Sequence, residues 1–135
     1  MNKTYRLLAT GAIIAAGFSV APGQGSVVLA SHSCDVNARI SRLSNTSYKI
    51  GGTGSCNESV ASLTLSCKPV HRHSTYWHSH SGTTFPASSN RSSISWDWGP
   101  LSGTNGDTYK SSCTGQFADH GSTVTRSDES FSINL

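Results

Sequence analysis

Hydrophobic and polar residues alternate along much of the chain after residue 33, which is the periodicity of a β-strand with one buried face. No segment beyond residue 30 has a helical periodicity of useful length. Glycine, asparagine and serine clusters separate the alternating runs, as expected for turns. The pattern predicts an all-β fold of about seven short strands. The clearest runs are ASLTLSC (61–67), SSISWDW (92–98), TYKSSCTGQF (108–117) and SFSINL (130–135). In the first, we expect Ala61, Leu63, Leu65 and Cys67 to point inward.

Two further alternating segments flank a turn-prone Ser-Asn-Thr trio at 44–46. A hairpin centred on this trio places Ile40 opposite Ile50 and Cys34 opposite Cys56. The register that pairs the apolar residues therefore also pairs the two cysteines. We predict a disulfide between Cys34 and Cys56.

The chain contains four cysteines and no Cys-x-x-Cys motif, so the sequence indicates neither a redox motif nor a zinc knuckle. An even number of cysteines in an exported chain is typical of disulfides. With Cys34 paired to Cys56, the second predicted disulfide joins Cys67 to Cys113.

The N-terminal 30 residues have the features of a secretory signal peptide. Lys3 and Arg6 precede an apolar run, and a small-residue stretch ends at Ala30. Cleavage after Ala21 also fits the small-residue rule, but it leaves a proline first. We therefore expect residues 1–30 to be a signal peptide and residues 31–135 to form a single domain that is secreted, extracellular and free of membrane spans.

Charge adds little to this picture. Without Lys3 and Arg6, the ten basic residues of the chain become eight, against seven acidic residues. A nearly neutral domain without a basic run gives no reason to expect nucleic acid or an anionic membrane as a partner.

The central part of the chain carries a family resemblance. The segment LTLSCKPVHRHSTYW (63–77), followed by GDTYKSSC (106–113), resembles the immunoglobulin-like arrangement of a strand cysteine, a following tryptophan, and a tyrosine-bearing strand with the second cysteine. Tyr109 stands further from its cysteine than the family's corner tyrosine does. The chain also resembles small exported immunoglobulin-like proteins of bacteria that have no assigned activity. The resemblance implies an antiparallel immunoglobulin-like β-sandwich of about seven strands with two disulfides, and no particular function. The matching positions are Cys67, Trp77, Tyr109 and Cys113.

The stretch HRHSTYWHSH (71–80) concentrates four of the six histidines of the chain in ten residues. If the chain turns at 74–76, each His-x-His pair projects from one face of its strand, and all four imidazoles come together. Imidazole nitrogens are good ligands for Zn²⁺ and Cu²⁺. The same residues also fit an exposed hairpin that merely tolerates histidine, since no acidic residue is near in the sequence. A surface that charges near pH ~6.5 is a further interpretation. The candidate metal ligands are His71, His73, His78 and His80.

Aromatic residues provide a second candidate surface, because exposed rings stack on sugars in many exported β-domains. We favour the alternative that Trp96 and Trp98, which share a strand face with Ile94, fill the core. The candidate ligand-binding aromatics are Tyr76, Trp77, Trp96 and Trp98.

An enzyme is not expected, because no Gly-x-Ser-x-Gly motif, paired carboxylates or free cysteine is available as a nucleophile. The leading hypothesis is a secreted, monomeric, non-enzymatic module that binds an extracellular protein or glycan and needs no cofactor. The alternatives are extracellular Zn²⁺ or Cu²⁺ binding through the histidines, and a secreted inhibitor or antimicrobial.

Overall fold

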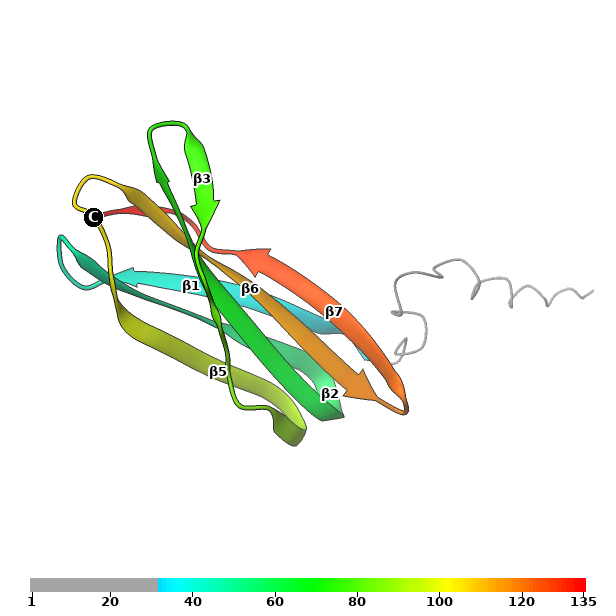
Figure 1. Cartoon of the computed structure of the whole chain (residues 1–135). Coiled ribbons are helices and arrows are strands. Elements are labelled where there is room, and N and C mark those ends of the chain that lie inside the picture. Colours follow the sequence, from blue (N-terminus) through cyan, green and yellow to red (C-terminus); the bar gives the residue numbers. More distant parts are fainter. Residues whose placement is uncertain (1–31) are drawn as a thin grey trace, which may run out of the picture.

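The computed structural model describes residues 32–135, which form eight β-strands and no helix (Figure 1). The predicted signal peptide, residues 1–30, lies outside the described residues. Within the described part, no helix is long and apolar enough to cross a membrane. In chain order the strands are β1 (Cys34–Arg42), β2 (Ser47–His73), β3 (Tyr76–Ser79), β4 (Thr83–Thr84), β5 (Ser88–Ser102), β6 (Thr108–Asp119), β7 (Ser122–Glu129) and β8 (Ile133–Asn134).

All of these strands belong to one antiparallel sheet, in which β1, β2, β6 and β7 follow one another. The 27-residue β2 organises the sheet, because its first half pairs with β1 and β5 and its second half with β6. The β2–β5 register shifts between Ser55 and Val60, and a bulge of this kind bends a strand. The sheet curls into a half-barrel, with β1 lying across from β6 and β7 (Figure 1). The all-β antiparallel fold is thus confirmed, but one curled sheet stands where two separate sheets were predicted.

The β1–β2 hairpin has the register predicted from the sequence, with Ile40 opposite Ile50 and Cys34 opposite Cys56. The cysteines form the expected disulfide, and their Cα atoms lie 4.0 Å apart. The second disulfide joins Cys67 of β2 to Cys113 of β6, which also lie directly opposite each other. The two disulfides therefore hold β2 to β1 and to β6.

The core fills the inside of the curl, and β6 contributes alternate side chains to it, including the fully buried Phe117. One inward position differs from the prediction. Ala61 is exposed, whereas Val60 is only 1% exposed. This position directly follows the irregular β2–β5 register between Ser55 and Val60, and the other three residues of the predicted set, Leu63, Leu65 and Cys67, face inward as expected.

The C-terminal region also differs from the prediction. The sequence pattern missed β7, because Val124 is the only apolar residue that this strand buries. The predicted strand 130–135 is reduced to β8, and Phe131 is 70% exposed.

Gly115 of β6 lies close to Val36 of β1, on the opposite wall of the half-barrel. A Cβ atom at this position would lie 2.6 Å from Cγ2 of Val36 in β1 and 2.9 Å from Cζ of Phe117. Both neighbours are buried, so neither has free space to move into. The curl therefore depends on the missing side chain.

Gly115→Ala is expected to lower the free energy of unfolding by about 1–3 kcal/mol, because the added methyl overpacks the contact with Val36. Urea denaturation measures the loss. Gln116→Ala, at the neighbouring exposed position of the same strand, is the control and should change stability by no more than about 0.5 kcal/mol. Adding Val36→Ala should recover part of the loss; strictly additive effects would contradict this explanation.

Candidate functional site

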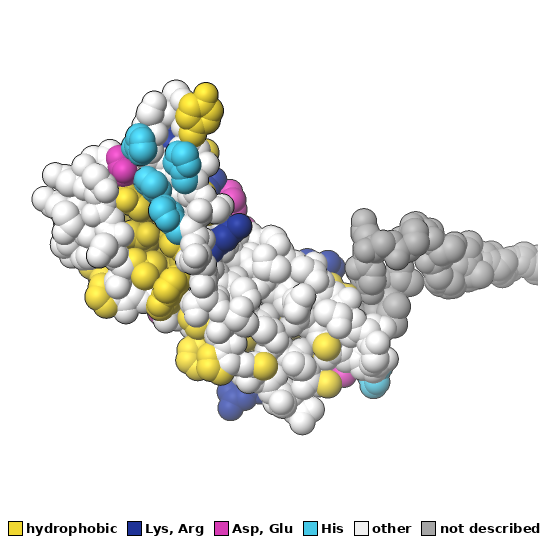
Figure 2. Space-filling model, viewed as in Figure 1, with side chains coloured by type: hydrophobic (Ala, Val, Ile, Leu, Met, Phe, Trp, Pro, Cys, Tyr) yellow, Lys and Arg dark blue, Asp and Glu magenta, His cyan; other side chains and the backbone are white. Residues whose placement is uncertain are grey.

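The four clustered histidines lie on a hairpin formed by the end of β2 and by β3. His71 is directly opposite His78, and His73 is opposite Tyr76. The two turn residues between the strands include Ser74, which has a φ of 65°. Directly opposite residues, and residues two apart on one strand, share a face of a hairpin, so one face carries all four imidazoles. Figure 2 shows the histidine side chains gathered on this hairpin, with an acidic side chain beside them.

His71 lies at the centre of this group. Its Nδ1 atom is 2.6 Å from Nε2 of His80, a hydrogen bond. Its ring centroid lies 5.6 Å from that of His78 and 5.8 Å from that of His73. The ring centroids of His73 and His78 are 5.9 Å apart. The histidines therefore form one contiguous cluster.

Asp107, which precedes β6, completes the cluster, although no acidic residue is near the histidines in the sequence. Its Oδ2 atom lies 3.4 Å from Nε2 of His71 and 4.0 Å from Nδ1 of His73. The side chains of Asp107 and His71 are 15% and 16% exposed, whereas that of His73 is 65% exposed. One ligand atom from each of the three residues lies within 4.8 Å of the other two.

Tyr109 positions the loop that carries Asp107. Its hydroxyl oxygen accepts a hydrogen bond of 2.8 Å from the backbone N–H of Thr104, and its ring stacks on His71 with the centroids 5.1 Å apart. The same side chain therefore supports the acidic loop and the central histidine. This tyrosine was noted in the sequence for its family resemblance, and the structure gives it a role in tying the loop.

The surroundings of His71 favour its neutral form. Burial is the first cause that lowers its pKa below the ordinary value, and His80 is the second. Asp107 opposes these effects, while His78 and His73 add to them. A neutral imidazole has a lone pair available for a metal ion.

The spacing of the three ligand atoms suits a small tetrahedral ion. Zn²⁺ binds nitrogen and oxygen at about 2.0–2.1 Å, which separates neighbouring ligands by about 3.3 Å. The observed 3.4 Å between His71 and Asp107 matches this edge, and the 4.0 Å between His73 and Asp107 requires only a small side-chain movement. With Nε2 of His71 on the metal, its Nδ1–H donates to His80, which then orients the ligand.

A groove of about 520 Å³ opens beside the cluster and shares His71 and His80 with it. Tyr48 is part of its wall, and burial raises the pKa of this phenol to about 12, with a smaller contribution from Tyr109. Tyr48 is therefore a neutral phenol at physiological pH and supplies no anionic ligand. Leu101 and Trp98 give the groove an apolar side.

The candidate aromatic residues do not form one platform. Tyr76 is 73% exposed, whereas Trp77, on the opposite face of the hairpin from His78, lies against Arg72 and Lys110. In β5, Trp98 packs against the core, but Trp96 is 36% exposed and stacks on Phe85. The prediction that both tryptophans fill the core is therefore wrong for Trp96. Within residues 32–135 no ring contact links the hairpin aromatics to those of β5.

Comparison of the chain with protein-family models, with curated proteins and with solved structures gives no match.

Proposed function

We propose that the protein binds a divalent transition-metal ion, best represented by Zn²⁺, through His71, His73 and Asp107. The convergence of these three ligand atoms within 4.8 Å of one another carries the proposal. His78 is the nearest additional donor, and His80 orients His71 through their hydrogen bond. A half-buried carboxylate beside several imidazoles gives a charged and a neutral ligand type, which suits Zn²⁺ and Cu²⁺.

The proposal includes that the protein is exported from the cell. Both disulfides are consistent with an extracellular location. The protein would then bind its ion outside the cell, as a monomer that performs no catalysis. The dispersed aromatic residues give no specific support to the protein-binding or glycan-binding hypothesis. The immunoglobulin-like relationship and the inhibitor or antimicrobial function likewise remain predictions.

Calorimetric titration of the oxidised, tag-free protein with Zn²⁺ tests the site. Asp107→Asn is expected to weaken Zn²⁺ binding about tenfold to a hundredfold, because it removes the only anionic ligand without changing the side-chain shape. His71→Ala should remove the hairpin site altogether. Ser79→Ala, which changes an exposed side chain on the opposite face of the same hairpin, is the control and should bind as the unmodified protein does.

A second readout examines the orientation of His71 directly. In the Zn²⁺-bound protein, ¹⁵N NMR of the imidazoles should show His71 coordinated through Nε2 and protonated at Nδ1. Unchanged His71 nitrogen shifts at saturating Zn²⁺, or full binding by the Asp107→Asn variant, would contradict the proposal.

A further inference from the structure

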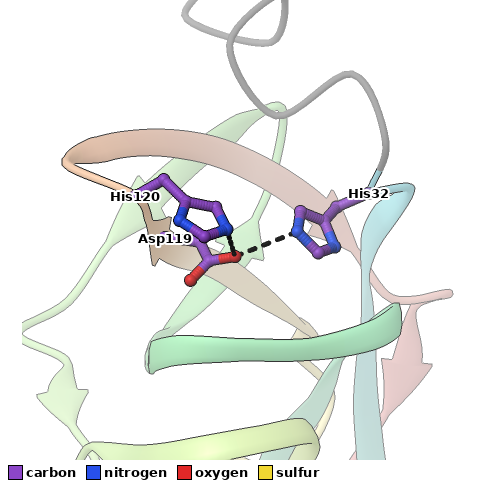
Figure 3. A group of neighbouring side chains, drawn as sticks. All are labelled: His32, Asp119 and His120. Atoms are coloured by element: carbon purple, nitrogen blue, oxygen red, sulfur yellow. Dashed lines mark ion pairs between the residues drawn. The ribbon is translucent and has the colours of Figure 1, made fainter.

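A second group of histidines and an aspartate lies at the other end of β6. Asp119 ends this strand, His120 follows it in the β6–β7 turn, and His32 precedes β1. Oδ2 of Asp119 lies 3.0 Å from Nε2 of His32 and 3.3 Å from Nε2 of His120 (Figure 3). One ligand atom from each residue lies within 4.8 Å of the other two. Both measured distances match the ligand spacing of about 3.3 Å around tetrahedral Zn²⁺.

The local fold directs these side chains toward one another. Asp119 pairs with Ser122, so His120 and Gly121 form a two-residue hairpin turn, with φ values of 48° and 79°. Histidine is among the few residues other than glycine that adopt this left-handed conformation with some frequency. The backbone N–H of Ala61 donates to Oδ1 of Asp119 at 3.3 Å, which leaves Oδ2 facing the histidines.

Two of the three side chains are largely buried and the third is exposed, as in a binding site that is open on one side. The side chains of His32 and Asp119 are 8% and 14% exposed, while that of His120 is 82% exposed. A carboxylate held away from water with two imidazoles on one of its oxygens gains from a cation between them. An incoming ion reaches the group from the side of His120.

We propose that His32, Asp119 and His120 form a second Zn²⁺ site, separate from the hairpin site and weaker than it. The twelve residues of β6 separate the two groups by about 35–40 Å, so their charges are screened from each other. The site links the segment before β1 to the turn between β6 and β7. Its occupation therefore stabilises the fold in addition to binding the ion.

One buried atom explains the lower affinity. When Nε2 of His32 binds Zn²⁺, the proton of this imidazole resides on Nδ1. Within the described part of the chain, Nδ1 of His32 is buried and has no hydrogen-bond partner. His71 in the hairpin site has His80 as the corresponding acceptor. The missing acceptor makes binding at His32 about tenfold to a hundredfold weaker than at the hairpin.

The test uses the His71→Ala variant, in which the hairpin site is removed. Calorimetry should detect one Zn²⁺ ion bound per protein, with lower affinity than at the hairpin site. Zn²⁺ should also raise the melting temperature of this variant. Both effects should disappear in His71→Ala/His120→Ala. They should persist in His71→Ala/Ser122→Ala, the matched control in the same turn. His120 is largely exposed, but alanine is strained at its φ of 48°, so the melting temperature of each variant is compared with and without Zn²⁺ rather than between variants.

Two results would overturn the second site. The His71→Ala variant binding no Zn²⁺ is one, and Zn²⁺ binding that persists after His120→Ala is added is the other. Neither result affects the hairpin site, which is judged from the unmodified protein and the Asp107→Asn variant.

Discussion

Replacing Cys67 and Cys113 with alanine is expected to lower the free energy of unfolding by about 4 kcal/mol and to weaken Zn²⁺ binding at the hairpin. The loss of stability follows from the loop of the unfolded chain that this disulfide closes, since the cysteines are 46 residues apart. The loss of affinity is expected because the same disulfide holds β6, which follows Asp107, in register with the part of β2 that leads to His71. Urea denaturation measures the first effect and calorimetry at low temperature the second.

The other disulfide provides a matched control. Cys34→Ala/Cys56→Ala opens a loop of 22-residue separation and should cost about 3 kcal/mol. This disulfide joins β1 to β2 and does not set the β2–β6 register, so hairpin Zn²⁺ affinity should be unchanged. Equal Zn²⁺ affinities in the two double variants would show that the disulfide between Cys67 and Cys113 does not hold Asp107 against the histidines.

Acidification from pH 7 to pH 5 is expected to weaken Zn²⁺ binding at the hairpin about a hundredfold, because each ligating imidazole must lose its proton to bind. The pKa of His71 is lowered, first by burial and then by His80, so His71 keeps its metal-binding form to a lower pH than an ordinary imidazole does. Calorimetric titrations at several pH values measure the change. An affinity that does not depend on pH would exclude imidazole ligands.

The same pKa affects the stability of the metal-free protein. The folded His71 has a lower pKa than in the unfolded chain, where the ordinary value is about 6.5, so the folded protein binds fewer protons between the two values. This contribution to stability is complete above the unfolded pKa and is lost as the pH falls through the folded one. His71→Ala should therefore lose less stability on acidification than the unmodified protein, and an equal loss would contradict this account.

Local patterns predicted the β1–β2 hairpin and both disulfides correctly. The alternation of apolar residues and the position of Cys34 opposite Cys56 depend on contacts within one hairpin, which the sequence displays directly. The half-barrel could not be predicted in this way, because it depends on the bulge near Val60 and on the space left by Gly115. Neither feature has a periodic signal.

Two errors at the candidate sites have identifiable causes. Trp96 shares its strand face with the buried Ile94, yet β5 pairs only with β2 and leaves part of this edge strand exposed. Asp107 was missed because it is remote from the histidines in sequence. However, extending the antiparallel register from Cys67 and Cys113 would have placed it beside His73.

The hairpin of β2 and β3 projects from the body of the sheet (Figure 1), and residues 73–80 are all exposed. Its tip is therefore free of the packing constraints that govern the core, and its length can change during evolution or protein engineering. Because side chains alternate between faces, lengthening each strand by two residues preserves the shared face of the imidazoles, whereas adding a single residue to one strand turns part of the set away. The half-barrel can thus serve as a frame for exchangeable sets of metal ligands, with changes in strand length restricted to even steps.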